Sequence, residues 1–321
     1  MKIVSNKNSI NLPQANGGGG VTVENISKTY GKKKEITALN DISFNVKAGE
    51  LFGIIGPDGA GKTSLFRILT TLLLADSGSA TVDGFDIVKD YKEIRKRVGY
   101  MPGKFSLYPD LSVEENLNFF GTIFNTSIQE NYELIKDIYI QIEPFKKRKA
   151  GKLSGGMKQK LALCCALIHR PTVLFLDEPT TGVDAISRKE FWEMLRGLKQ
   201  QGITILVSTP YMDEADLCDQ VVLLQNGQVL SINSPAGIVQ NFSAPLWAVK
   251  APNMFHLLNE LKKSSIGEDV YPFGEYHHVV LKDRSREKLL HEFVQNHKDE
   301  NMELQEVKPN IEDCFIALMK N

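Results

Sequence analysis

The chain has 321 residues, with 38 lysine and arginine side chains against 39 aspartate and glutamate side chains, a formal net charge of −1. A chain without excess positive charge is poorly suited to bind nucleic acid or anionic lipid, so we expect no nucleic-acid partner. Its 42% of hydrophobic residues excludes a disordered or fibrous protein. The length predicts about two domains, each with a core of its own.

The sequence contains no candidate for a membrane anchor. The longest apolar runs, at 51–55, 69–75 and 172–176, are much shorter than the roughly 20 residues of a membrane span. The first residues show no apolar run typical of a secretory signal. Four cysteines without C-x-x-C spacing predict reduced thiols in a cytosolic protein. Residues 1–20 end in four glycines and predict a flexible tail.

The first regular elements predict a sheet followed by a helix. Residues 21–30 alternate in polarity and predict a strand, and residues 42–50 predict a second one. Residues 51–56 form a continuous apolar run that ends in glycine, which is typical of a strand buried on both faces. Residues 61–74 carry leucine, isoleucine and phenylalanine at helical spacing.

The middle of the chain predicts further layers around this sheet. Residues 80–87 contain an Asp-Gly pair between apolar residues, which predicts a hairpin. Residues 102–171 are mainly helical in pattern, whereas 172–177 and 203–209 predict two more buried strands. Residues 221–230 predict a hairpin that turns at an Asn-Gly pair. The expected fold class is therefore α/β, with an inserted helical segment.

A domain boundary is expected after residue 243, beside a Ser-Ala-Pro sequence. Strand and helix patterns then alternate to the end of the chain. The expected elements are a strand at 246–251, a helix at 253–263, a strand at 277–283, a helix at 286–297 and a strand and helix within 304–320. Residues 244–321 therefore predict a small accessory α+β domain, and residues 21–243 form the first domain.

A phosphate-binding loop is expected between the first buried strand and the following helix. GPDGAGKT at 56–63 fits the pattern G-x-x-x-x-G-K-[ST] in the strand–loop–helix context that the motif requires. Its glycines let backbone N–H groups approach phosphates, Lys62 is expected to reach the β- and γ-phosphates, and Thr63 to ligate Mg²⁺. The residues expected to contact ATP here are Gly56, Pro57, Asp58, Gly59, Ala60, Gly61, Lys62, Thr63 and Ser64.

Two carboxylates end the strand in LFLDEP at 174–179. We expect Asp177 to hold Mg²⁺ through water, and Glu178 to polarise the attacking water as the catalytic residue. An acidic pair at a strand end is also a common solvated arrangement. The phosphate loop upstream favours the catalytic interpretation.

The discriminating element is LSGGM at 153–157, where Ser154, Gly155 and Gly156 open a helix and present N–H groups and a hydroxyl to an anion. With this string, residues 21–240 resemble the ATP-binding cassette (ABC) family. The resemblance implies a P-loop NTPase (RecA-like) core, an antiparallel β subdomain and a helical subdomain at about residues 101–171. It also implies that the bound nucleotide is ATP and that the metal ion is Mg²⁺.

The resemblance also implies roles for other residues. Tyr30 matches the aromatic residue that stacks on adenine, and Asp184 in TTGVD matches the D-loop aspartate at the dimer seam. The LSGGM signature contacts the γ-phosphate of ATP held by a facing cassette, so two cassettes close head to tail over two ATP molecules. Residues 105–117 match the segment that receives the coupling helix of a membrane permease; the alternative is an ordinary helical surface.

Two positions depart from the family pattern. Gly103 stands where the family has a glutamine that contacts Mg²⁺, and Pro210 stands where it has a histidine that contacts the γ-phosphate. Loss of one positioned donor typically costs about 10²–10³ in rate, so we expect slow turnover at the chain's own site. This favours pairing with a paralogous cassette that retains both residues. The alternative is a homodimer in which Lys104 or Thr209 replaces the lost contacts.

The tail at 308–320 is similar to the ending of cassettes from the drug- and polysaccharide-export branch, which have separate permeases. The expected function is the ATPase subunit of a drug-efflux-like ABC exporter, held at the cytoplasmic face of the membrane by its permease. One alternative is a soluble ABC ATPase that acts on the ribosome. Another is a regulatory ATP-binding subunit with little hydrolysis.

Overall fold

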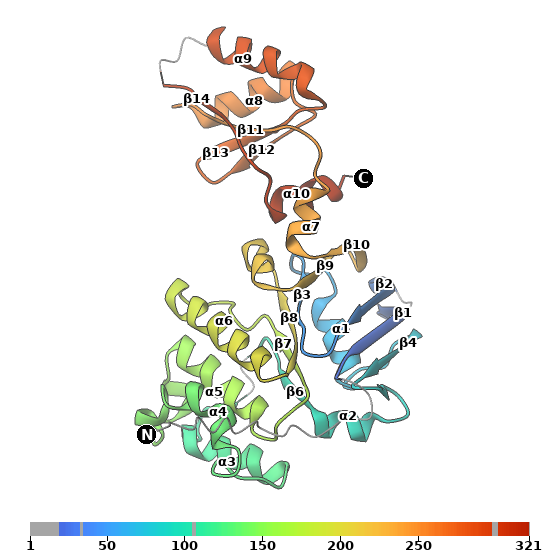
Figure 1. The fold of residues 1–321 in the computed structure, drawn as a ribbon, viewed down its shortest axis with the longest axis vertical. Helices are drawn as coiled ribbons and strands as arrows, with labels where there is room; N and C mark the ends of the chain where they lie inside the picture. The colour runs from blue at the N-terminus through green and yellow to red at the C-terminus, as the bar shows by residue number, and fades with distance from the viewer. Residues whose placement is uncertain (1–18, 33–34, 105–106, 297–300, 321) are drawn as a thin grey trace, which may run out of the picture. The chain divides into compact units, whose positions relative to one another are not determined.

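The computed structural model describes residues 19–32, 35–104, 107–296 and 301–320 (Figure 1). The chain divides into two compact units, Met1–Pro235 and Ala236–Asn321, which are described separately below. The domain boundary expected after residue 243 stays a prediction. Of the tail expected at 1–20, all but the last two positions lie outside the described residues.

A six-stranded sheet forms the centre of the first unit, in the order β10-β9-β3-β8-β7-β6. Every pairing is parallel except that of β9 with β10, as expected for strands buried on both faces. The strands are β3 (Leu51–Ile55), β6 (Val98–Met101), β7 (Val173–Asp177), β8 (Thr204–Thr209), β9 (Gln220–Gln225) and β10 (Gln228–Asn233). The carboxyl ends of β3, β7 and β8 meet at one edge, where the candidate site lies.

A second, antiparallel sheet has the order β2-β1-β4-β5. Its strands are β1 (Val21–Tyr30), β2 (Ile36–Val46), β4 (Ser77–Val82) and β5 (Phe85–Asp86). Helix α1 (Lys62–Leu69) shares a core with both sheets (Figure 1), and the rings of Phe44 and Phe52 stack at 5.3 Å within that core. The hairpin expected at 80–87 is confirmed by the pairing of β4 with β5.

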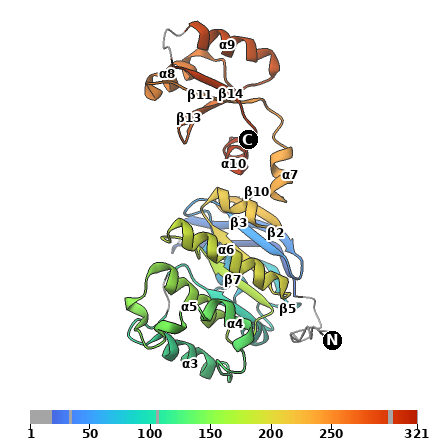
Figure 2. The ribbon, with the colours of Figure 1, turned by 60° about the vertical axis from the view of Figure 1, so that its left-hand side comes forward.

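Helices fill the segment between β6 and β7, where α3 and α4 pack against α5. Figure 2 shows α6 along one face of the central sheet. The helices of the first unit after α1 are α2 (Tyr91–Arg97), α3 (Val113–Ile123), α4 (Tyr132–Tyr139), η1 (Glu143–Phe145), η2 (Ala150–Lys152), α5 (Gly155–Leu167), α6 (Ala185–Gln200) and η3 (Met212–Leu217). Within the described parts of the chain, no helix has the length and apolar character needed to cross a membrane.

The second unit has the βαββαβ order of a ferredoxin-like fold, with the sheet order β12-β13-β11-β14. Helices α8 and α9 lie on one face of this sheet and α10 on the other (Figure 2). After α7 (Pro235–Gln240), its elements are β11 (Leu246–Lys250), α8 (Met254–Ser264), β12 (Asp269–Phe273), β13 (Tyr276–Val280), η4 (Arg284–Arg286), α9 (Glu287–Asn296), β14 (Glu303–Glu306) and α10 (Ile311–Leu318).

Two elements of the first unit end well before their predicted limits. The helix predicted at 61–74 ends at Leu69, because Thr71 has a φ of 63° and the Thr70 hydroxyl bonds back to the Phe66 carbonyl at 2.7 Å. The strand predicted at 42–50 ends at Val46, because Glu50 turns the chain by accepting a bond from the Lys47 N–H.

Candidate nucleotide site

The predicted phosphate loop joins β3 to α1 as the sequence pattern requires. Gly61, the residue before α1, has a φ of 105°, and a Cβ on it would lie 2.3 Å from the Ala38 carbonyl oxygen. Only glycine fits that position. Because no side chain caps α1, the first N–H groups of the helix are available to an anion.

Lys62 lies inside this loop and is only 3% exposed. Its Nζ donates hydrogen bonds to the carbonyl oxygens of Gly56 at 2.7 Å and Pro57 at 3.0 Å. It also forms an ion pair with Glu178 Oε1 at 3.1 Å. The loop lysine and the expected catalytic carboxylate, 116 positions apart by residue number (178 − 62), are thus in direct contact.

Asp177 and Glu178 are held in place by a residue that the sequence analysis missed. Ser208, opposite Asp177 on β8, donates its hydroxyl to Asp177 Oδ1 at 2.7 Å. The same hydroxyl accepts the Glu178 N–H at 3.1 Å. Glu178 has a φ of 51°, a strained value for a residue other than glycine, at the point where the chain leaves β7. The buried serine therefore orients the Asp177 carboxylate and contacts the backbone of Glu178.

Tyr30 lies at the end of β1, on a different sheet from the phosphate loop. Its ring is 36% exposed, and its hydroxyl lies 3.0 Å from Ser64 Oγ in α1. This bond places an exposed aromatic ring beside the loop residues, where a flat base would find a stacking surface.

The LSGGM signature opens α5. Ser154 is the N-cap and accepts the Met157 N–H at 3.4 Å, as expected for this residue type. Asp184 similarly caps α6 by accepting the Ser187 N–H at 3.0 Å, and this bond is the main cause that holds the pKa of Asp184 below its usual value. A Cβ on Gly156 would lie 2.7 Å from Ser187 Oγ, so glycine is required there.

Gly103 lies next to the Asp177 carbonyl group and the Glu178 Cβ. A Cβ on Gly103 would be 3.0 Å from the Asp177 carbonyl oxygen and 3.8 Å from the Glu178 Cβ. Gly103, Glu178, Gly155 and Gly182 all line a cavity of about 110 Å³. A side chain at position 103 would therefore approach the Asp177 backbone, beside a cavity that Glu178 also lines.

Pro210 directly follows β8, and its neighbour Thr209 is fully buried. The Thr209 hydroxyl donates to Glu214 Oε2 and accepts the Tyr211 N–H at 3.1 Å. The only proton of the Thr209 hydroxyl is thus donated to Glu214 and is not available to a phosphate. This weakens the alternative that Thr209 replaces the contact of the missing histidine.

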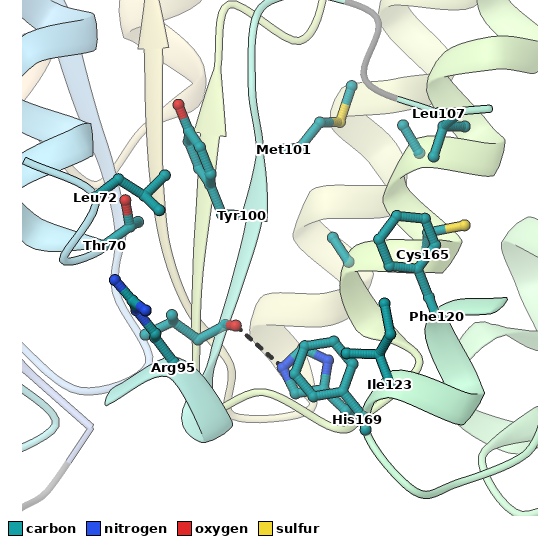
Figure 3. Close-up of a pocket in the computed structure, with 14 residues that line it drawn as sticks. Thr70, Leu72, Arg95, Tyr100, Met101, Leu107, Phe120, Ile123, Cys165 and His169 are labelled. Atoms are coloured by element: carbon teal, nitrogen blue, oxygen red, sulfur yellow. Dashed lines mark hydrogen bonds between the residues drawn. The ribbon is translucent and has the colours of Figure 1, made fainter. Parts of the chain in front are cut away.

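A larger, apolar pocket of about 400 Å³ lies between α3, α5 and β6 (Figure 3). Its lining includes Leu107, Phe120, Ile123 and Cys165. His169 stacks on Phe124 at 3.8 Å, and its Nε2 lies 3.0 Å from the Val98 carbonyl oxygen, the dashed bond in Figure 3. Burial lowers the pKa of His169 to about 4, so the ring is neutral and the pocket is uncharged there at neutral pH.

Part of the segment expected to receive a coupling helix, 105–117, contributes to this pocket through Leu107 and continues into α3. Positions 105 and 106 lie outside the described residues. Ser112 and Glu115 form a capping box that starts α3, with both reciprocal bonds present.

Curated relatives cover most of the chain. The probable multidrug ABC transporter ATP-binding protein YbhF of Escherichia coli is 37% identical over 305 residues, which are 93% of this chain and 52% of YbhF. The chain thus spans about half the length of that relative. The Nod factor export ATP-binding protein I of Burkholderia lata is 38% identical over 224 residues, 69% of this chain and 73% of that protein.

Solved structures agree with the observed fold. CbiO1 from Clostridium perfringens, described as part of the ABC transporter complex cbiONQ, gives a TM-score of 0.61 at 28% identity and covers 69% of this chain and 90% of its own. The cassette MJ0796, described as a dimer bound to ADP and Pi, gives 0.60 at 28% identity, with coverage of 67% and 98%. The family model described as ABC transporter matches residues 39–181. The chain therefore belongs to the ABC transporter family, as an ATP-binding cassette protein.

Proposed function

We propose that the chain is the ATPase subunit of an ABC exporter and powers transport through a separate membrane permease. The observation that best supports this proposal is the ion pair between Lys62 of the phosphate loop and Glu178, which directly follows Asp177. The names of YbhF and of the Nod factor protein support export as the kind of transport. In this proposal the chain lies at the cytoplasmic face of the membrane and is held there by the permease.

The loop N–H groups and Lys62 would bind the phosphates of ATP, and Tyr30 would stack on the adenine. The Thr63 hydroxyl and the Asp177 carboxylate are hard oxygen ligands, which is the donor set that suits Mg²⁺. Bound Mg²⁺ would neutralise phosphate charge. Because Lys62 pairs with Glu178, a phosphate oxygen would compete for the same ammonium group and release the carboxylate to accept a hydrogen bond from water.

A complete site would need a second cassette. The signature residues Ser154, Gly155 and Gly156 would act on ATP held by the facing cassette, with Asp184 at the seam between the two. The dimer described for MJ0796, at 28% identity, supports this pairing. One chain with one phosphate loop then contributes half of each of two sites.

The apolar pocket of Figure 3 is the surface that we assign to the permease. Ile123 beside it is 58% exposed, and Tyr108 and Phe119 nearby in the chain pack edge to face while both remain partly exposed. Exposed apolar side chains around a pocket are typical of a protein interface. CbiO1, described as part of the cbiONQ complex, supports such an assembly for a related cassette.

We further propose that the chain's own ATP site is slow and that its partner is a paralogue. Neither Gly103 nor Pro210 has a side-chain donor, and the Thr209 hydroxyl is occupied by Glu214. Lys104, which is exposed, remains the alternative that would permit a homodimer. The intact signature would let this chain complete the active site of the paralogue.

Purification from detergent-solubilised membranes, followed by mass spectrometry, tests these proposals. A permease with a second cassette that has the glutamine and histidine would support both. A permease with this chain alone would keep the exporter and refute the paralogue. Ribosomal proteins without a permease would refute the exporter.

The variants Pro210→His and Gly103→Gln test the slow site in the same assembly. Restoring a donor at a charge-developing site is expected to raise turnover by about 10²-fold. Gly103→Ala is the matched control, because it adds only the Cβ that approaches the Asp177 carbonyl. No gain from the two restoring changes together would remove the reason for an asymmetric pair.

A further inference from the structure

Glu214 is a buried carboxylate between two segments that the proposed function uses. It lies in η3 and is only 1% exposed. Its Oε1 accepts a hydrogen bond from Thr180 Oγ1 at 2.8 Å, and its Oε2 accepts one from Thr209 Oγ1. Both threonines are as buried as the glutamate. Because an unpartnered carboxylate is costly to bury, these three side chains hold one another in a single arrangement.

Arg188 of α6 adds a further contact from the other side. Its Nε lies 3.7 Å from Glu214 Oε1, and its guanidinium carbon lies 4.3 Å from the centre of the Tyr211 ring. The Tyr211 N–H donates to the Thr209 hydroxyl. Pro210 itself has neither an N–H nor a polar side chain, so its neighbours hold this segment. The chain is thus fastened on both sides of Pro210.

The turn 180–184 begins at the threonine that bonds to the glutamate, and it packs against the signature. A Cβ on Gly155 would lie 3.6 Å from the Gly182 carbonyl oxygen, and one on Gly156 would meet Ser187 at 2.7 Å. Ser187 lies in the first turn of α6, which directly follows the turn 180–184, so a displacement of the turn would also displace the residue that Gly156 approaches. Neighbouring residues therefore connect the end of β8 with the signature through Glu214, Thr180 and Ser187.

We propose that Glu214 is a positioning residue that fixes the turn 180–184 to the end of β8, so that the signature follows the position of the Thr209–Pro210 segment. This inference rests on the proposed function, in which the segment belongs to the chain's own ATP site and the signature to its partner's. Because Glu214 is buried, it would contact neither ATP. It links one site to the other through the hydroxyl of Thr180.

Thr180→Val and Thr180→Ser form the matched pair that tests this role. Valine keeps the shape of threonine but removes the hydroxyl, whereas serine keeps the hydroxyl. Losing a buried hydrogen bond to a carboxylate is expected to change local equilibria by about 5- to 30-fold. Hydrogen exchange of the amides in 154–157 and 180–187 should therefore rise by about that factor in Thr180→Val and stay near wild type in Thr180→Ser.

The same variants are then assayed in the purified assembly. Thr180→Val should lower kcat by about 5- to 30-fold while the KM for ATP stays within about twofold, because the phosphate loop is untouched. Glu214→Gln, which keeps the shape but loses an acceptor, should act in the same direction. Equal exchange and equal kcat for the valine and serine variants would overturn the inference. A wild-type assembly without ATPase activity would instead refute the proposed function, and the exchange measurement would still test Glu214.

Discussion

Replacing Ser208 with alanine should weaken the binding of Mg²⁺ with ATP without displacing the backbone. The hydroxyl donates to Asp177 Oδ1 at 2.7 Å, and the variant leaves that buried carboxylate oxygen without this donor. A hydrogen bond to a charged group contributes about 1.5–3 kcal/mol, which corresponds to about 10- to 100-fold in the apparent Mg²⁺ affinity. The Glu178 N–H keeps its bond to the Ser208 carbonyl oxygen at 3.0 Å, so Glu178 stays in place.

The assay is a titration of Mg²⁺ against the binding of a fluorescent ATP analogue, which does not require turnover. Nucleotide binding without Mg²⁺ should be unchanged, because the hydrogen bonds of the Ser208 hydroxyl go to Asp177 and Glu178 and not to the phosphate loop. Ser231→Ala, on β10 at the edge of the same sheet, is the control. If Ser208→Ala and Ser231→Ala both require the same Mg²⁺ concentration as wild type, the bond from Ser208 to Asp177 does not contribute to Mg²⁺ binding.

Three further changes test other parts of the molecule. Tyr30→Ala should raise the KM for ATP by about 5- to 100-fold through lost base stacking, whereas Tyr30→Phe, which loses only the bond to Ser64, should raise it less. Ile123→Glu should weaken permease binding in a pull-down by about 10-fold or more and spare ATP binding, with the similarly exposed Ile140→Glu as control. The pKa of His169 is lowered to about 4 in the folded chain, whereas an unfolded histidine has a pKa of about 6.5. Between these two values the unfolded chain binds a proton that the folded chain does not, so the folded state loses stability as the pH falls. The free energy of unfolding in urea should therefore be about 2 kcal/mol lower at pH 5 than at pH 7.5 because of this group. His169→Gln should lose that pH-dependent part, and an unchanged difference between the two pH values would contradict the assignment.

The sequence predicted those segments of the candidate site that are contiguous in the chain. The phosphate loop and the acidic pair each combine a residue pattern with a strand end, so their placement at one sheet edge followed from parallel pairing. Ser208 and Glu214 were missed because their partners Asp177 and Thr180 lie 31 and 34 residues away. Ser208 faces Asp177 only because β8 pairs in parallel with β7 in this alignment.

In the second unit, the sequence analysis missed the strand β12, which contains Pro272. Proline cannot donate a hydrogen bond to a sheet ladder and is unfavourable within a central strand. Because β12 is an edge strand that pairs only with β13, its outward side has no ladder to interrupt. The proline is tolerated because β12 lies at the edge of the sheet, and a local sequence pattern does not show which strands are edge strands.

The C-terminal motif that linked the chain to exporters has a structural explanation of its own. Asp313 is fully buried and accepts bonds from His278 Nδ1 at 2.6 Å, Tyr271 Oη at 2.8 Å and the Asn310 N–H at 2.9 Å. Burial raises the pKa of Asp313, but the bonds from His278, Asn310 and Tyr271 outweigh it and hold the pKa below its usual value. The aspartate therefore fastens α10 to the sheet. The motif around Asp313 is therefore explained by the folding of this unit, and a fold does not by itself imply a function. The proposal of export depends instead on the relatives and on the nucleotide site.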